Sequence, residues 1–509
     1  MAKLIVAWRG SLLEHRFEGR IPLIEGIRAS GADLALPCGG NHTCGKCRVL
    51  MHNPPPPKKE EERLLPPGDL ARGVRLACFI TIDGDTSVVI EEEDGPPQIR
   101  LEGYLPNFTP DAPEAGEGYG FAVDIGTTTV VACLYKMGSS LPLQSCAQRN
   151  NQSAYGADVI SRIQHAGAEG VQGLQKAICS QLARMLADCM SRVGISVREV
   201  SGCVVTGNTT MLHLLTGLDP SGIAAAPFTP QSLFDGDWPG EQLGLLCPVY
   251  LPRCPGAYLG ADVTCAALAA ELDRPGPPAL LVDIGTNGEM VLATGGRCRG
   301  CSTAAGPAFE GAGISQGMPA AAGAVDRVFV VDGKVGFTTI GDAPAAGICG
   351  SGLMDAVAVM LKTGAIDETG LLQEGDAFAI GSSGVRVTQE DIRQVQLAKA
   401  AIAAGIDTLL AECGITPQEI GAFYLAGGFG SYINLQSAAD IGLLPPQLVQ
   451  KAVVLGNAAG SGAALILLSR QMALRAKALG AGIEEINLST SARFTESYID
   501  HMLFDASGG

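Results

Sequence analysis

The chain has 509 residues, an apolar content of 47%, 67 glycines and a formal net charge of −17. This length implies about two to four domains, and the acidic balance argues against nucleic acid or an anionic membrane as a partner. No apolar run approaches the roughly 18 residues of a membrane span, and the apolar start is too short for a signal peptide, so we expect a cytoplasmic α/β protein.

Four cysteines near the start of the chain have the spacing of iron–sulfur ligands. Cys38, Cys44 and Cys47 form C-x5-C-x2-C, and Cys78 follows 31 residues later. A [2Fe–2S] cluster takes four thiolates, three from one loop and one from a distant segment, in a pattern close to that of plant-type ferredoxins. A zinc ribbon needs two close cysteine pairs instead, and disulfides are unexpected without a secretory signal. We therefore predict a β-grasp [2Fe–2S] ferredoxin domain in residues 1–93.

The elements expected around these ligands are two strands, a helix, the ligand loop, a strand, a loop and a last strand. Leu4, Val6 and Trp8 occupy alternate positions, as on the buried face of a half-buried strand. Residues 54–62 are expected to be a solvated loop, and residues 75–82 a strand that carries Cys78. Residues 40–47 nearly match the Walker A motif, but they end in Cys where Ser or Thr must bind magnesium, so the cysteines explain the glycines better.

Two further features follow along the chain. Residues 94–118 are rich in Pro, Gly and acidic residues, which predicts a semi-extended, mobile linker. Residues 174–193 have apolar positions at helical spacing, which places Cys189 in the core of a helix. Cys298 and Cys301 form C-x2-C, and both a second metal or redox pair and a plain small-residue turn stay open for them.

The sequence D-I-G-T occurs twice, at residues 124–127 and 283–286, each time between two apolar strands. Such turns offer backbone N–H groups and hydroxyls that wrap a polyphosphate, and Asp124 and Asp283 can hold Mg²⁺ through water. We predict that both hairpins face one nucleotide across a cleft; two unrelated Asp-capped hairpins are the alternative. The nucleotide-binding candidates are Gly126, Thr127, Thr128, Thr129, Gly285, Thr286, Asn287 and Gly288.

Two more segments are candidates for this cleft. A helix over residues 391–406 is followed by a strand and a glycine turn with Gly427, Gly428 and Gly430, which let the backbone approach a base and ribose. Lys399 on that helix flanks the adenosine or is an ordinary exposed lysine. Asp262 opens a helix, where it either orients the attacking water or serves as an N-cap. Residues 456–462 begin a helix that we expect to return to the first lobe.

Together these motifs resemble the acetate and sugar kinase/Hsp70/actin superfamily. Residues 124–129 match its first phosphate motif, residues 283–288 its second and residues 426–430 its adenosine motif. An adrenodoxin-like ferredoxin fused to this fold is similar to the reductive activators of corrinoid proteins, and the likeness covers nearly the whole chain. Further strings that carry it are residues 155–163, 207–213, 305–311 and 347–352.

The resemblance implies a domain order and a function. Residues 1–93 are the ferredoxin domain, 94–118 the linker, 119–274 actin-like lobe I, and 275–509 lobe II with helices that return to lobe I. The implied reaction is ATP-dependent transfer of one electron from the cluster to the inactive Co(II) of a corrinoid protein, which regenerates Co(I). The implied cofactors are the [2Fe–2S] cluster, ATP and Mg²⁺, with Asp124, Asp262 and Asp283 as the catalytic residues.

The implied partners are a corrinoid iron–sulfur protein or the corrinoid subunit of a methyltransferase, a low-potential reductant, and a second copy in a homodimer. Two alternatives stay open: an electron donor to another low-potential enzyme, like the 2-hydroxyacyl-CoA dehydratase activators, and a ferredoxin with a nucleotide-sensing docking domain. This chain also departs from the pattern. No domain is expected between linker and core, where longer members have one, and residues 483–509 lack the cysteine cluster of the methylamine methyltransferase activators.

Overall fold

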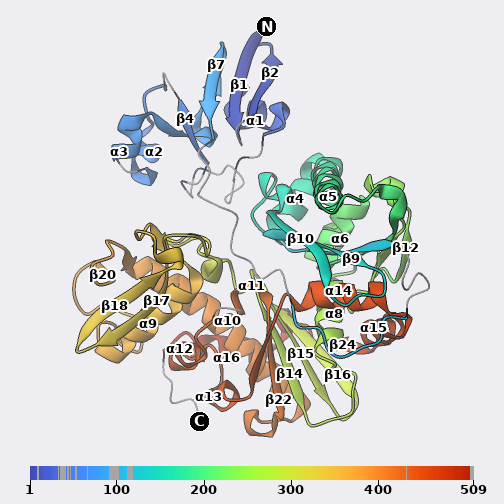
Figure 1. The fold of residues 1–509 in the computed structure, drawn as a ribbon. Coiled ribbons are helices and arrows are strands. Elements are labelled where there is room, and N and C mark those ends of the chain that lie inside the picture. Colours follow the sequence, from blue (N-terminus) through green and yellow to red (C-terminus); the bar gives the residue numbers. More distant parts are fainter. Residues whose placement is uncertain are drawn as a thin grey trace. The chain divides into compact units, whose positions relative to one another are not determined.

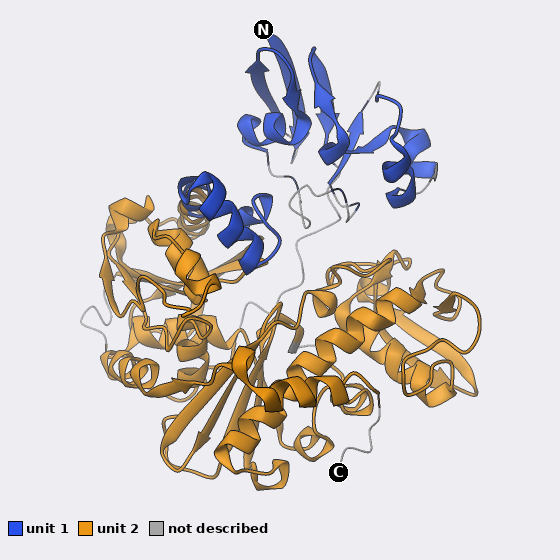
Figure 2. Ribbon diagram, turned by 180° about the vertical axis from the view of Figure 1, so that it is seen from behind, with its two compact units in different colours: residues 1–95, 149–178 blue, residues 96–148, 179–509 orange. Residues whose placement is uncertain are grey.

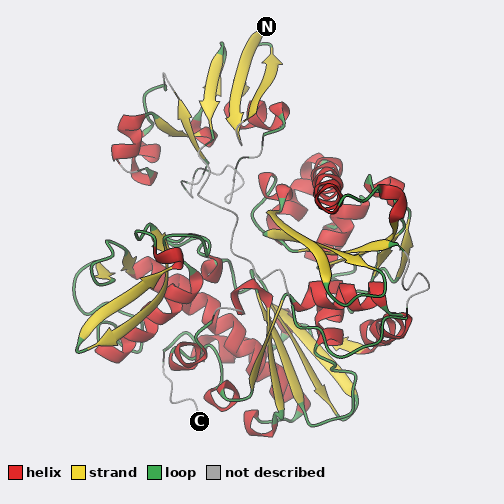
Figure 3. Ribbon diagram, viewed as in Figure 1, coloured by secondary structure: helices red, strands yellow, loops and turns green. Residues whose placement is uncertain are grey.

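The protein is described from a computed structural model, and the described residues are 1–8, 11–32, 34, 42, 45, 47–51, 54–65, 67–90, 103–111, 118–430 and 433–504. They belong to two compact units, one of residues 1–95 with 149–178 and one of residues 96–148 with 179–509 (Figure 2). Both units mix helices and strands (Figure 3).

The smaller unit contains a five-stranded sheet. Its strand order is β2 (Ser11–Phe17), β1 (Ala2–Trp8), β7 (Thr86–Val89), β4 (Arg48–Met51) and β5 (Val74–Leu76). Strand β1 is antiparallel to β2 and parallel to β7, which confirms the strand expected over residues 4–8. Helix α1 (Leu23–Ser30) packs Leu23 and Ile27 onto Leu4 and Val6 of β1.

Two expectations for this unit are wrong. Residues 59–64 form helix α2 (Lys59–Leu64) rather than a solvated loop, because Glu61 has a tertiary partner: it is only 2% exposed and accepts a hydrogen bond from the Leu76 amide at 2.6 Å. Cys78 lies on a 3₁₀ turn, Ala77–Phe79, and not within a strand. Strand β5 ends at Leu76, and the chain turns through a bond from the Ile80 amide to the Ala77 carbonyl at 3.2 Å.

Further helices and one short strand pair belong to this unit. Helix α3 (Pro67–Arg72) precedes β5, and β3 (Ile21–Pro22) pairs with β6 (Thr81–Ile82). Helix α4 (Val159–Glu169) is capped by Asp158, whose carboxylate accepts from the Ser161 amide at 2.8 Å. Helix α5 (Gln172–Val193) begins in this unit and ends in the larger one.

The larger unit contains two six-stranded sheets that share one topology over five strands, while the sixth strand is added at opposite edges (Figure 1). The first has the order β10 (Pro142–Arg149), β9 (Thr129–Lys136), β8 (Tyr119–Ile125), β11 (Val200–Gly207), β13 (Val249–Leu251) and β12 (Gly236–Trp238). The second has the order β24 (Ile483–Glu485), β16 (Arg297–Thr303), β15 (Gly288–Thr294), β14 (Ala279–Ile284), β22 (Ala422–Ala426) and β23 (Ala452–Gly456). In each sheet, the strand that enters a D-I-G-T turn (β8 or β14) is antiparallel to the strand that leaves it (β9 or β15). On its other side it is parallel to β11 or β22, respectively. The repeat seen in the motif therefore extends to the sheets.

Helices lie between the two sheets. Helices α8 (Ala261–Ala269), α14 (Ala458–Leu468) and α15 (Arg470–Gly482) share one core with residues of both sheets, such as Val131 and Leu281. Helix α14 contacts β8 and β11 of the first sheet, as expected for a chain that returns to the first lobe. The opposite face of the second sheet is covered by α10 (Gln389–Cys413), which contains the helix expected over residues 391–406. Helix α9 (Gly350–Thr363) shares this core and packs on the strand of residues 324–331.

Smaller elements complete this unit. They are α6 (Thr209–Thr216), α7 (Ser221–Ala224), α11 (Gly427–Gly430), α12 (Leu435–Asp440), α13 (Pro446–Val449), α16 (Ala492–Asp500), β17 (Ala324–Val331), β18 (Lys334–Thr339), β19 (Gly347–Ile348), β20 (Ala377–Ala379) and β21 (Arg386–Thr388). Within the described part of the chain, no helix combines the length and apolarity that a membrane crossing needs.

The linker contacts the larger unit where it is described. The Tyr104 amide donates to the Leu455 carbonyl at 2.8 Å, and the Asp111 amide to the Leu468 carbonyl at 3.2 Å. The Asp111 carboxylate accepts from the Ser469 hydroxyl at 2.5 Å. The expectation of a mobile linker is therefore wrong for residues 103–111, because main-chain bonds fix them along α14.

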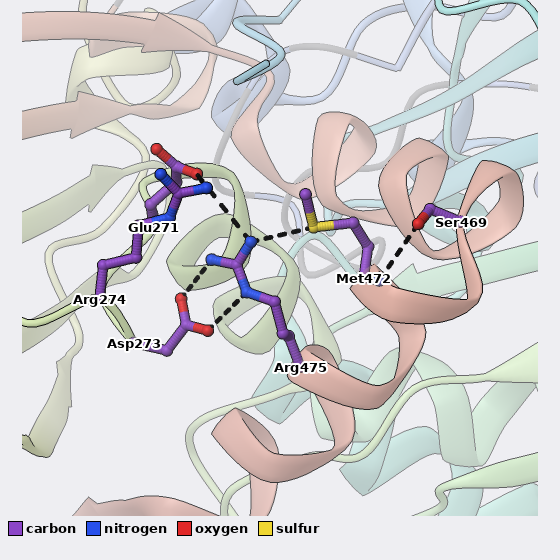
Figure 4. A network of polar contacts seen from close by, with 6 residues as sticks. All are labelled: Glu271, Asp273, Arg274, Ser469, Met472 and Arg475. Atoms are coloured by element: carbon purple, nitrogen blue, oxygen red, sulfur yellow. Dashed lines mark hydrogen bonds and ion pairs between the residues drawn. The ribbon is translucent and has the colours of Figure 1, made fainter. Parts of the chain in front are cut away.

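A polar network beside Ser469 holds α15 against the segment that joins the two sheets (Figure 4). Arg475 donates two hydrogen bonds to Asp273, both at 2.6 Å, and one of its nitrogens lies 3.1 Å from the Met472 sulfur. Glu271 pairs with Arg274 at 2.7 Å on the same segment. The guanidinium thus connects the segment between α8 and β14 to a helix that packs on α8.

Candidate functional site

Both D-I-G-T segments form tight turns between antiparallel strands, and the first turn is one residue longer than the second. In the first, the Gly126 amide donates to the Thr129 carbonyl at 2.9 Å; in the second, the Gly285 amide donates to the Asn287 carbonyl at 3.0 Å. Each bond closes a tight turn between antiparallel strands. The side-chain hydroxyls of Thr128 and Thr286 are presented at these turns.

Glu310 joins the two turns. It lies at the end of a 3₁₀ turn, Ala308–Glu310. One carboxylate oxygen accepts from the Thr128 hydroxyl at 2.6 Å, and the other accepts from the Thr286 hydroxyl at 2.6 Å. The structure therefore brings both hairpins to one place, which rules out two unrelated hairpins.

Four carboxyl groups gather beside these turns, and each holds its proton more tightly than usual. Burial raises the pKa of Asp124 to about 8, with repulsion from Asp262 and Asp283 as further causes. Burial raises the pKa of Asp283 to about 7 and that of Asp262 to about 6. The pKa of Glu289 is raised well above its ordinary value, by burial first and then by Asp262 and Asp283.

Asparagines support this group. The Asn457 side chain hydrogen-bonds Asp124, which opposes the rise of its pKa, and accepts from the Gly460 amide at 2.8 Å at the start of α14. The Asn208 side chain donates to the Thr127 hydroxyl at 3.3 Å and accepts from the Met211 amide at 2.9 Å. Both side chains thus couple a helix start to the first hairpin.

Asp262 is not an N-cap. Helix α8 begins at Ala261 after Gly260, and Asp262 accepts from the Val263 amide at 2.8 Å. Its carboxyl is electrostatically coupled to those of Asp124 and Asp283. The structure therefore places it with the two hairpin aspartates.

The glycine turn also contacts this group. Gly427 has φ +89°, and a Cβ there would lie 2.5 Å from an Asp283 carboxylate oxygen, so only glycine fits. Gly428 faces open space, and Gly430 ends the short helix α11. Next to them, the rings of Phe429 and Phe309 stack at 4.8 Å with an interplanar angle of 8°.

Lys399 is buried, and its ammonium contacts the C-terminal segment rather than the glycine turn. Its side chain is 0% exposed, and its ammonium donates to the Leu503 carbonyl and lies 5.2 Å from the centroid of the Phe504 ring. Burial lowers its pKa to about 8. The interpretation as an exposed lysine is wrong, because α10 packs this face under the C-terminal segment.

The arrangement fits a polyphosphate with a hard divalent cation. The raised pKa values of these clustered carboxyls show that no nearby positive charge among the described residues stabilises their ionised forms. Carboxylate oxygens are also the ligands that Mg²⁺ prefers, and the ion usually retains several waters. No three His, Cys, Asp or Glu side chains in the described ranges are arranged to hold a metal by themselves. A cation shared between protein, water and phosphate is consistent with both observations.

Two of the four predicted cluster ligands are described. The Cys47 carbonyl accepts from the Ala77 amide at 2.8 Å, so Cys47 and Cys78 lie at the same end of the β4–β5 pair. Gly45 has φ +65°, as expected for a glycine that lets the ligand loop turn tightly. Cys38 and Cys44 lie outside the described residues.

Cys298 and Cys301 do not form a metal or redox pair. Both lie on β16, three residues apart, so their side chains point to opposite faces of the sheet. Cys298 belongs to the core around α8 and α14, whereas Cys301 belongs to the core around α9 and α10. The open interpretation as a second cysteine site is therefore wrong.

Several residues of the site escaped sequence reasoning. Glu289 directly follows the second turn, and Glu310 lies within the 305–311 string, but no local pattern assigns either a role. Asn457 begins the glycine-rich start of α14. Asn208 lies in the 207–213 string that carries the resemblance, and the Asn-Thr-Thr sequence at 208–210 could have identified it as a candidate.

Comparisons with known proteins agree with this geometry. Residues 278–508 match the C-terminal domain of RACo, the ASKHA domain, and residues 119–275 match the RACo middle region. The chain is 35% identical to the corrinoid activation enzyme RamQ of Eubacterium limosum, over 80% of this chain and 73% of that protein. The chain belongs to this family of corrinoid activation enzymes.

Two further relatives have the same kind of description. One is the [Co(II) methylated amine-specific corrinoid protein] reductase of Methanosarcina barkeri, 26% identical over 77% of this chain and 78% of that protein. The other is a solved structure, a reductive activator for a corrinoid iron–sulfur protein, with a TM-score of 0.70, 29% identity, and coverage of 99% of this chain and 98% of that one. The resemblance to corrinoid activators is confirmed.

The match to the middle region corrects one expectation. No separate domain was expected between the linker and the nucleotide-binding core, yet residues 119–275, which include the predicted lobe I at 119–274, match the family's own middle region. That region contains the first D-I-G-T hairpin, and this motif led the sequence reasoning to treat the region as part of the nucleotide-binding core only. The region is present in this chain.

Proposed function

We propose that this chain is an ATP-dependent reductive activator that delivers one electron to the Co(II) form of a corrinoid protein and regenerates Co(I). The observation that carries the proposal is the 35% identity to a corrinoid activation enzyme over 80% of the chain. The paired hairpins joined by Glu310 support the nucleotide dependence.

ATP and Mg²⁺ occupy the group of carboxyls and turns in this proposal. Asp124 and Asp283 hold the cation through water, and Asp262 orients the attacking water. The hairpin amides and hydroxyls bind the phosphates, and the turn at Gly427 approaches the adenosine. The raised pKa values support this assignment, since a cation is what relieves such repulsion.

The electron passes through residues 1–93, the proposed ferredoxin domain. Cys38, Cys44, Cys47 and Cys78 hold a [2Fe–2S] cluster, which supplies one electron at a time when bound. The strand order of the sheet and the helix packed on it support a β-grasp fold. A low-potential reductant supplies the electron.

The remaining organisation is proposed with it. Residues 94–118 link the ferredoxin domain to lobe I at 119–274 and lobe II at 275–509. The partner is a corrinoid iron–sulfur protein or the corrinoid subunit of a methyltransferase, the activator is a homodimer, and all of them reside in the cytoplasm. ATP can drive the reduction only if it binds two states of the complex with different affinities. Each 1.4 kcal/mol of that difference in binding free energy corresponds to a shift of about 60 mV in the reduction potential for one electron.

The deciding experiment is anaerobic and spectroscopic. The chain, a chemical reductant and a Co(II) corrinoid protein are combined with Mg–ATP, with Mg–ADP, or without nucleotide, and Co(I) absorbance is followed. We expect Co(I) only with Mg–ATP. Equal Co(I) yields in all three mixtures would overturn the ATP-dependent proposal.

A further inference from the structure

Two thiols of the larger unit lie unusually close together. Cys146 on β10 and Cys189 on α5 have sulfur atoms 3.1 Å apart, although 43 residues separate them in the chain. Both are free thiols. A disulfide needs a sulfur–sulfur distance of about 2.05 Å, so a movement of about 1 Å would allow the bond.

The two thiols differ in exposure. Cys189 is 1% exposed, and the helical pattern already placed it in the core. Cys146 is half-buried, and its sulfur also lies 3.9 Å from the Met185 carbonyl. An external reagent therefore reaches Cys146 more readily than Cys189.

Their hydrogen bond also makes them chemically different. Cys189 donates to the Cys146 sulfur, which stabilises a thiolate there and lowers the pKa of Cys146. Arg192 lowers it further, while burial and Asp188 oppose the shift. The pKa of Cys189 is raised, by that bond first and by burial second, with Cys146 and Cys133 as further causes and Arg192 opposing.

We propose that Cys146 and Cys189 form a reversible disulfide, with Cys146 as the attacking thiolate and Cys189 as the resolving thiol. Cys146 attacks an oxidised low-molecular-weight disulfide, which forms a mixed disulfide and releases one thiolate. The Cys189 sulfur then attacks the Cys146 sulfur and releases the second thiolate. The two protein thiols lose two electrons and two protons, and the reagent disulfide is reduced to two thiols. The bond ties β10 to α5.

The test uses the full chain under anaerobic conditions with oxidised glutathione, followed by alkylation, trypsin digestion without reductant, and mass spectrometry. Cys146 and Cys189 fall in separate tryptic peptides, 137–149 and 185–192, each with a single cysteine. We expect these peptides to appear linked, and the link to be lost after dithiothreitol. Both peptides recovered only as alkylated thiols would overturn the proposal.

Three variants test the assignment of roles. Cys189→Ser should retain glutathione on Cys146, because the resolving thiol is gone. Cys146→Ser should form no link and acquire glutathione on Cys189 more slowly. Cys133→Ser, the matched control on β9, should form the link as the wild type does. Faster modification of Cys189 than of Cys146, or loss of the link in Cys133→Ser, would contradict the assignment.

Discussion

At the scale of single residues, protons and a cation compete for the clustered carboxyl groups of Asp124, Asp262 and Asp283. With pKa values of about 8 for Asp124 and about 7 for Asp283, both groups are largely protonated at pH 6.5. A divalent cation stabilises the charged form and must therefore displace these protons. The affinity for the cation should rise with pH up to about 8 and then level off, because no proton then remains to be displaced.

The first prediction follows from this competition. Binding of Mg–ATP should release protons at pH 6.5 and fewer at pH 9. Calorimetric titrations in two buffers of different ionisation enthalpy measure directly the number of protons released. Asp124→Asn should reduce the number of protons released, since it removes the group with the highest pKa of the three aspartates. Apparent binding enthalpies that are equal in both buffers at pH 6.5 would contradict the prediction.

Glu310 provides the second prediction. Its carboxylate holds Thr128 and Thr286 together, and hydrogen bonds to a charged group contribute about 1.5–3 kcal/mol each. Glu310→Ala should separate the hairpins and weaken Mg–ATP binding by about tenfold or more, which corresponds to about 1.4 kcal/mol. Glu310→Gln, which keeps the shape and one acceptor, should weaken it less.

Equilibrium binding of a fluorescent ATP analogue measures this effect. Glu496→Ala, at an exposed position of α16, is the matched control and should bind like the wild type. Tighter binding by Glu310→Ala would show the opposite role, in which the carboxylate occupies a phosphate position and is displaced by the nucleotide.

At the scale of elements, α15 is fixed to the segment between the two sheets by Arg475 and Asp273. Their side chains are only 18% and 24% exposed. Removal of one partner leaves a largely buried charge, so Arg475→Ala should lower the free energy of unfolding of the larger unit by about 2–3 kcal/mol. Thermal unfolding followed by circular dichroism measures the shift.

A surface pair of the same chemistry serves as control. Arg386 and Asp376 lie 3.1 Å apart, with side chains 55% and 92% exposed. Arg386→Ala should change the stability by less than about 1 kcal/mol, because water screens the pair. Equal destabilisation by both substitutions would mean that the Arg475 pair is not protected from solvent.

The sequence predicted the elements whose signals are local. Both D-I-G-T hairpins and the helix at 391–406 could be predicted, because turn glycines and apolar spacing are encoded within a few residues. Helix α10 is longer than predicted, although the capping box of Thr388 and Asp391 marks its start. Helix α2 was missed because its charged residues resemble a solvated loop, while the partner of Glu61 is distant in the chain.

The parts of the site that were missed depend on contacts between distant residues. Thr128 and Glu310 are 182 residues apart, and outside the site Cys146 and Cys189, which also contact each other, are 43 residues apart. No periodicity links such positions, so a single sequence carries no signal for them. For Cys298 and Cys301 the spacing suggested a pair, but the strand alternates its side chains and separates them.

At the scale of the whole molecule, the proposed chemistry is divided between the two compact units. Cys47 and Cys78 belong to the unit of residues 1–95 with 149–178, while Asp124 and Asp283 belong to the other. Each unit has its own core, so a substitution in one site should leave the other site folded. Electron acceptance and ATP hydrolysis should therefore be separable by mutation.

The last prediction uses this separation. Cys78→Ser should still hydrolyse ATP in the presence of the corrinoid protein, yet produce no Co(I), because the electron cannot be held. Asp283→Asn should accept one electron from the reductant, seen as bleaching of its visible absorption, yet also produce no Co(I). A mixture of the two variants then reports how the units cooperate. If each chain serves itself, the mixture stays inactive; if the units act across a homodimer, exchange of subunits restores part of the Co(I) yield. Full Co(I) formation by Asp283→Asn alone would show that electron transfer proceeds without the nucleotide site, and the coupling would have to be abandoned.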